Sequence, residues 1–181
     1  MNTLAVVVPP VPALLPEHAS LTDPVSALRS ACREAVALLL SGGPERVVLL
    51  ADPDDPWARP VAELLLADGG HRGQVVVGPA GPGDAVLVMA NGTARRSEQS
   101  PGGADERAVE HDDLVEKALA GCDGAALRCL DADLRAALLA SGTRALGELG
   151  ALLEHGARTG RLLYSGDPFG VQYWVAVLAC G

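Results

Sequence analysis

The chain has 181 residues, of which 49% are hydrophobic and 3% aromatic, and a formal net charge of −9. This length and apolar content predict a single folded domain over residues 1–181 and exclude general disorder. The negative charge argues against nucleic-acid and membrane partners, which require a basic protein surface. The four cysteines form no CxxC motif, which is consistent with reduced thiols in a cytoplasmic protein.

The first ninety residues alternate between short apolar runs and helical patterns. One helical pattern follows Asp23-Pro24 and ends at Gly42-Gly43, and Pro60 marks the start of the next. Strands that alternate with helices predict an α/β fold with a central, mostly parallel sheet and helices on both faces. Leu4–Val8 and Val47–Leu50 are typical of strands buried on both faces, and Val75–Val77 and Val86–Met89 are the third and fourth predicted strands.

The second half of the chain contains further helical patterns and ends in two predicted strands. The helices are expected from near Asp105, over Asp131–Ser141 and from Thr143 to His155. The strands are Leu162–Tyr164 and Val171–Leu178. Aromatic residues cluster here, and they are expected to pack in the core of the last strand or to line a pocket or a homodimer interface. They are Tyr164, Phe169, Tyr173 and Trp174.

Three loops are expected to meet at one edge of the sheet, because parallel strands end at the same edge and ligands bind there. Four prolines should make the first loop, Pro9–Glu17, stiff and extended. The second loop is Asp52–Pro56 and the third is Asn91–Gln99. The sequence therefore predicts a cleft that is lined by these loops.

The third loop contains the only Arg-Arg pair, Arg95 and Arg96. A guanidinium at the end of a strand can bind a carboxylate or a phosphate with two hydrogen bonds. Alternatively, these are surface arginines that pair with Glu98, Asp105 or Glu106. The predicted ligand-binding residues are Pro10, Asn91, Thr93, Arg95 and Arg96.

The sequence evidence for catalytic and metal-binding side chains is weaker than that for the arginine pair. His111 lies on the apolar face of its predicted helix, where it is either a hydrogen-bonded core residue or an acid/base that faces a cleft. Asp52, Asp54 and Asp55 could bind a divalent cation, but helix capping and turns explain them without a metal. We therefore expect no metal and no cofactor, and His111 is the candidate for a catalytic residue.

Several segments together resemble a known superfamily. They are the strand and proline loop ending in Leu14-Leu15-Pro16-Glu17, ANGTARRSE and PGGADERA within residues 90–108, HDDLVEKAL at 111–119, and DPFGVQYWVA at 167–176. Over nearly its whole length the chain is similar to the actinobacterial branch of the class III extradiol ring-cleavage dioxygenase subunit-B-like superfamily, which includes Memo-like proteins. This resemblance implies an α/β domain with a cleft at the strand ends.

The resemblance also implies where an iron site would lie. In catalytic members two histidines and a glutamate hold a non-haem Fe(II), and another histidine is the acid/base. Here Pro10 stands in the place of the first histidine, Asp52–Asp55 in the region of the second, and Asn91–Arg95 in that of the acid/base. Proline has no side-chain ligand, and arginine stays protonated.

These departures predict a non-catalytic member of the superfamily, a pseudoenzyme that has lost Fe(II) and ring cleavage. Its cleft is expected to bind a small anionic or aromatic ligand. Two alternatives stay open. The chain could be an active enzyme, either a divergent metal-dependent dioxygenase or a metal-free catalyst that uses His111. It could also be a homodimeric interaction protein.

Overall fold

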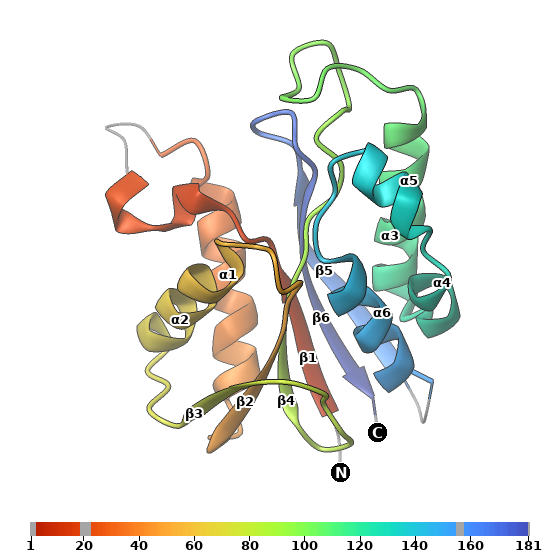
Figure 1. Cartoon of the computed structure of the whole chain (residues 1–181). Coiled ribbons are helices and arrows are strands. Elements are labelled where there is room, and N and C mark those ends of the chain that lie inside the picture. Colours follow the sequence, from red (N-terminus) through yellow and green to blue (C-terminus); the bar gives the residue numbers. More distant parts are fainter. Residues whose placement is uncertain (1–2, 19–22, 155–157, 181) are drawn as a thin grey trace.

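The structure, a computed structural model, describes residues 3–18, 23–154 and 158–180. It contains one six-stranded sheet with the strand order β3-β2-β4-β1-β6-β5 and helices on both faces, so the predicted α/β fold is confirmed (Figure 1). Strands β1, β2, β3 and β4 are parallel, whereas β6 is antiparallel to β1 and to β5. The strands are β1 Thr3–Val8, β2 Arg46–Leu50, β3 Gln74–Val77, β4 Ala85–Met89, β5 Arg158–Gly166 and β6 Tyr173–Cys180.

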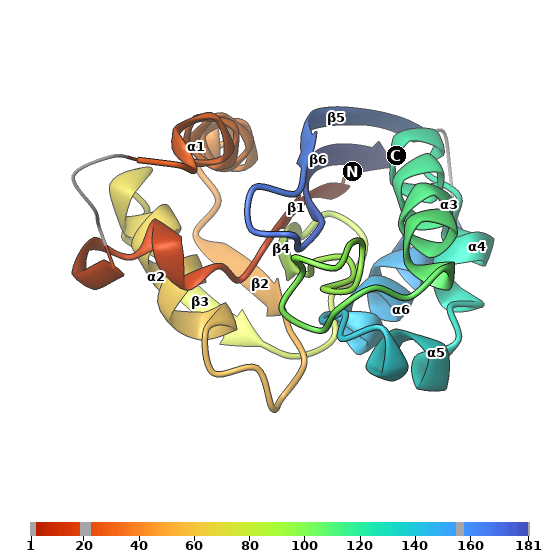
Figure 2. The same ribbon diagram turned by 90° about the horizontal axis from the view of Figure 1, so that it is seen from above.

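Helices cover the sheet in two groups (Figure 2). Helices α1, Ser26–Leu40, and α2, Ala58–Asp68, lie on one face. The other face carries α3 Arg107–Gly121, α4 Gly124–Arg128, α5 Ala132–Ala137 and α6 Thr143–Leu152. Because the sheet is covered on both faces, its central strands are apolar at consecutive positions and not only at alternate ones, apart from Thr3 and Arg46 at the starts of β1 and β2.

Two hydrophobic cores result from this arrangement. Along β1, Val6 and Val8 pack in the core beneath α1 and α2, and Ala5 and Val7 pack in the core beneath the other helices. Successive side chains of a strand point to opposite faces, which is why one strand serves both cores. The segment that follows β4 rises beyond the carboxyl ends of the parallel strands (Figure 1).

Several local predictions were wrong or incomplete. The proline loop is not extended throughout, because it contains two 3-10 turns, Pro12–Leu14 and Pro16–His18. The Arg29 guanidinium on α1 donates hydrogen bonds to the carbonyls of Ala13 and Leu14 and so holds this loop. The short helix α4 was not predicted, and His155, the predicted end of α6, lies outside the described residues.

Within the ranges that the structure describes, no helix is both long enough and apolar enough to cross a membrane.

Candidate functional site

A cleft of about 550 Å³ lies at the carboxyl ends of β1, β2 and β4, where the sequence predicted it. All three predicted loops contribute to it, together with Pro101, the segment between α5 and α6, and residues just before and at the start of β6. Its lining residues are Pro10, Val11, Pro12, Asp52, Asp54, Asp55, Pro56, Trp57, Asn91, Ala94, Pro101, Leu139, Ala140, Ser141, Val171 and Tyr173. Of the five predicted ligand-binding residues, Pro10 and Asn91 line this cleft and the other three do not.

Asp52 forms one wall of the cleft and also caps helix α6. Its Oδ2 accepts hydrogen bonds from the backbone N–H groups of Gly142 and Thr143, each at 3.0 Å. Its Oδ1 accepts from Arg144 at 3.1 Å and from Ala145 at 3.3 Å. These are the N–H groups that the first turn of a helix leaves without a partner. Asp52 therefore joins the end of β2 to the start of α6 from about ninety residues away in sequence.

Asn91 forms the neighbouring wall, immediately after β4. Its Oδ1 accepts a hydrogen bond of 2.9 Å from the Ser141 backbone N–H. Behind this contact lies the fully buried Arg135 side chain, whose Nη2 donates to the carbonyls of Asn91 at 3.1 Å and Ser141 at 2.7 Å. Its Nε donates to the Thr143 hydroxyl at 2.8 Å. Arg135 thus fixes both segments of the wall in one position.

Sequence reasoning did not identify Arg135 as important. It is the one arginine of the helical pattern over Asp131–Ser141, where an arginine is normally expected to face solvent, and only the tertiary structure shows that its side chain is buried. Burial lowers the pKa of Arg135 to about 10, which leaves the guanidinium charged at neutral pH.

His111 does not line the cleft. Its Nε2 lies 3.1 Å from Arg135 Nη1. Because a guanidinium only donates hydrogen bonds, Nε2 is the acceptor, and the neutral ring carries its proton on Nδ1. Burial, followed by the nearby Arg135 charge, lowers the pKa of His111 below its ordinary value. This geometry fits the hydrogen-bonded core histidine better than an acid/base that faces substrate.

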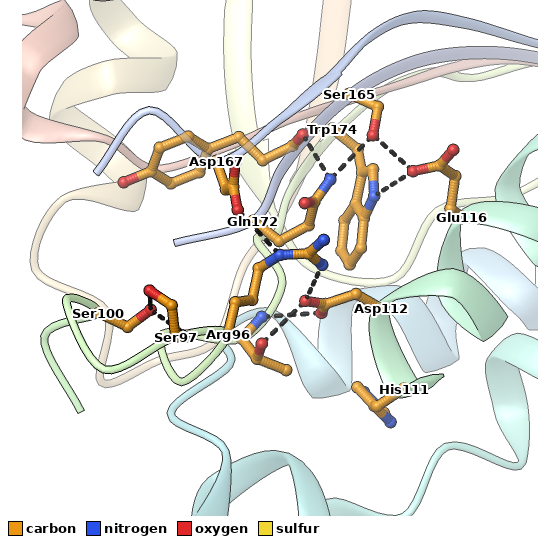
Figure 3. A network of polar contacts seen from close by, with 12 residues as sticks. Arg96, Ser97, Ser100, His111, Asp112, Glu116, Ser165, Asp167, Gln172 and Trp174 are labelled. Atoms are coloured by element: carbon orange, nitrogen blue, oxygen red, sulfur yellow. Dashed lines mark hydrogen bonds and ion pairs between the residues drawn. The ribbon is translucent and has the colours of Figure 1, made fainter. Parts of the chain in front are cut away.

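Arg96 belongs to a polar network on the α3 side of the loop (Figure 3), and Thr93 is part of the same network. The Thr93 backbone N–H and hydroxyl donate to the two oxygens of Asp112, which is 1% exposed. Arg96 lies between two carboxylates, with Nη1 2.8 Å from Asp112 Oδ2 and Nε 3.1 Å from Asp167 Oδ2. Partial burial alone would lower the pKa of Arg96, but these ion pairs outweigh it and raise the pKa.

The same region also connects α3 to the last two strands (Figure 3). Glu116 Oε2 accepts hydrogen bonds from the Trp174 indole and from the Ser165 hydroxyl. The Gln172 side chain in turn donates to the Ser165 hydroxyl. The polar groups of this network are thus paired with one another, and they hold α3 against β5 and β6.

Arg95 is also occupied inside the chain. Its Nη1 donates to the Ala137 carbonyl at 3.1 Å and lies 4.0 Å from Asp105 Oδ2. The pairing with Asp105 is one of those expected from the sequence, whereas Arg96 uses Asp112 and Asp167. Since neither guanidinium lines the cleft, the loop does not supply the cationic site that the sequence suggested.

The aromatic residues near the C-terminus separate into different environments. Trp174 is fully buried and Tyr173 is 5% exposed, so the surface of β6 does not offer them as a dimer interface. Tyr173 lines the cleft, which is one of the roles expected for this cluster, and Tyr173 and Trp174 both pack in the hydrophobic cores, which is another. Burial raises the pKa of Tyr173 to about 12, so the phenol stays neutral at physiological pH. Trp57, from the loop after β2, lines the cleft as well.

The three aspartates after β2 do not converge on a common point. Asp55 Oδ1 accepts hydrogen bonds from the backbone N–H groups of Trp57 and Ala58, at the start of α2. Asp52 is committed to α6 as described above. Among the residues that the structure describes, no group of three histidine, cysteine, aspartate or glutamate side chains is placed to hold a metal ion. Helix capping therefore explains Asp52 and Asp55.

The residues at the strand ends do not fit the iron site of the catalytic superfamily. Pro10 has no side-chain donor, the Asp52 oxygens accept four backbone hydrogen bonds, and Asn91 Oδ1 accepts one. A side chain cannot be added at Gly92, because a Cβ there would lie 2.6 Å from Asp112 Oδ1 and from Gln172 Cβ. A 2-His-1-carboxylate set has no counterpart in this arrangement.

A second hollow of about 680 Å³ runs along α3 and the start of α4. It is lined mainly by exposed side chains of α3, including Val109 and Leu114, and no strand ends point into it. The strand-end cleft is the better candidate site, because loops from several elements converge on it.

No protein-family model matches the chain, and no curated protein matches its sequence.

Proposed function

We propose that this protein binds a small ligand in the strand-end cleft and does not cleave aromatic rings. The observation that supports this proposal most strongly is that the cleft is open although several hydrogen-bonding atoms of its wall already have partners within the chain. The two carboxylate oxygens of Asp52 and the Oδ1 of Asn91 are already used for hydrogen bonds within the chain. The space itself stays open, at about 550 Å³, which is enough for a small organic molecule.

The lining favours an aromatic ligand over an anionic one. Trp57 and Tyr173 offer aromatic surfaces, and Pro10, Val11 and Pro12 offer a stiff apolar surface on the other loop. Flat apolar side chains stack well against an aromatic ring. An anion would find three aspartates in the lining and no cationic side chain among the described lining residues.

Binding is tested by ligand-observed NMR with a library of aromatic fragments and a variant with a filled cleft. Ala140→Trp places a large side chain at a half-buried lining position and should abolish binding. Ala136→Trp is the matched control, because Ala136 is exposed on α5 and does not line the cleft. Binding that persists in the Ala140→Trp variant, or the absence of any fragment that binds, contradicts the proposal.

The absence of ring cleavage is tested separately. The purified protein is reconstituted with Fe(II) under anaerobic conditions, its bound iron is measured, and oxygen uptake is followed after catechols are added. We expect no stoichiometric iron and no uptake above that of free Fe(II). One iron per chain together with catechol-dependent oxygen uptake would refute this part of the proposal and would favour the active dioxygenase.

A further inference from the structure

We propose that the ligand of the strand-end cleft is an aromatic organic cation, of the arylalkylamine class. The inference rests on the proposed function, because it assigns a charge to the ligand of that same cleft. The cleft lining contains three carboxylates and two aromatic rings, and none of the described lining residues carries a positive charge. The carboxylates favour a ligand with a positive charge, and the aromatic rings favour a ligand with a flat ring.

The net charge of the lining stays negative after its capping interactions are counted. Asp52 and Asp55 face the first turns of α6 and α2, and a helix N-terminus carries roughly half a positive elementary charge. With Asp54 included, three negative charges are thus offset by about one, so roughly two remain. The buried Arg135 lies behind the wall, where Asp112 and then Asp52 oppose its charge.

Asp54 is the carboxylate that remains available to a ligand. It is exposed and lines the cleft, in contrast to its capping neighbours Asp52 and Asp55. In the described part of the chain, its carboxylate accepts no hydrogen bond from another residue and forms no ion pair. An ammonium group at this position would gain a charge-assisted hydrogen bond, which is stronger than a bond between neutral groups.

The aromatic residues of the cleft also favour a positively charged ligand. The faces of tryptophan and tyrosine rings carry partial negative charge and attract cations. Trp57 is 38% exposed at the cleft, and Tyr173 lies deeper, at 5%. Because burial keeps the Tyr173 phenol neutral, its ring remains available for this contact without adding a repulsive charge. A carboxylate on the ligand would be repelled by the aspartates and by the ring faces.

Three probes of nearly equal shape separate charge from ring recognition: benzylammonium, benzyl alcohol and benzoate. Each is titrated into the full-length ¹⁵N-labelled protein at low ionic strength, and the Trp57 indole and nearby backbone signals report binding in the cleft. We expect benzylammonium to bind at least about tenfold more tightly than benzyl alcohol, and benzoate not to bind. The advantage of benzylammonium should shrink as salt is added, since exposed charges are screened.

The charge contribution is assigned with two isosteric variants. Asp54→Asn should reduce the benzylammonium affinity about three- to tenfold and leave the benzyl alcohol affinity unchanged. Asp113→Asn removes the same charge from an exposed position on α3 outside the cleft, and it should change neither the benzylammonium affinity nor the benzyl alcohol affinity. Equal or tighter binding of benzyl alcohol or benzoate overturns the cation assignment but leaves ligand binding intact. If none of the three probes binds in the cleft, both the assignment and the proposed function fail.

Discussion

The capping of α6 by Asp52 can be tested with one substitution. Asp52→Ala removes the acceptor of four backbone N–H groups, and the local residue at the cap position, Gly142, has no side chain to replace it. Loss of a helix cap costs about 1 kcal/mol, and loss of a negative charge at a helix N-terminus costs about 0.3–1 kcal/mol more. Since four donors lose their partner here, we expect the free energy of unfolding to fall by about 2 kcal/mol.

The neighbouring Asp54 provides the control, because it is exposed in the same loop and has the same side chain. In a chain of this length, a loss of about 2 kcal/mol lowers the Tm by about 4–8 °C, which calorimetry or urea unfolding measures easily. Asp54→Ala should stay within about 0.5 kcal/mol of the wild type. If the two variants have equal stability, Asp52 is not the cap of α6, and the account of the cleft wall is wrong.

Four further substitutions test other parts of the structure. Asp112→Asn should lower the free energy of unfolding by about 2–3 kcal/mol in urea titrations, because the buried carboxylate accepts three hydrogen bonds. The pKa of His111 is lower in the folded protein than in the unfolded chain. Its contribution to stability is therefore complete above the unfolded pKa of about 6.5 and is lost as the pH falls through the folded pKa. Between about pH 7 and pH 5, the wild type should lose more stability than the His111→Gln variant. Gly142→Ala should lower the Tm in thermal unfolding, because Gly142 has a φ of +76° and a Cβ there would lie 2.4 Å from Ala90 Cβ. Gly147→Ala, inside α6, is the opposite case. A Cβ at Gly147 meets nothing within 4 Å, so this substitution should stabilise the protein by about 0.5–1 kcal/mol.

The fold was predictable where burial on both faces leaves a signal in the sequence. Runs such as Leu4–Val8 and Val86–Met89 are apolar at every position, which is typical of strands in a parallel sheet between helix layers. The direction and place of β6 were not predictable in this way. It lies antiparallel between β1 and β5, and an apolar run has the same appearance whichever direction the strand takes. Short elements such as α4 give too few residues for a periodic pattern.

The place of the cleft was predictable for a topological reason, but its chemistry was not. Loops after parallel strands must meet at one edge, and Pro10 and Asn91 lie there as expected. The direction of Arg96 depends on Asp112 and on Asp167, which is 71 residues away in sequence. Contacts between such distant residues leave no local pattern, so the adjacent arginines suggested an anion site that the lining does not contain.

The two sides of the cleft differ in how firmly they are held, and this difference bears on ligand selection. Asp52 and Arg135 join the ends of β2 and β4 to the start of α6, so the inner wall is held in position by hydrogen bonds within the chain. A preorganised wall lowers the entropy that binding must overcome. Trp57 and Leu139, by contrast, lie at the cleft with 38% and 54% of their surface exposed. Substitutions at these two positions, like those at the exposed Asp54, should therefore change the preferred ligand at little cost in folding stability, whereas those at the wall change both together.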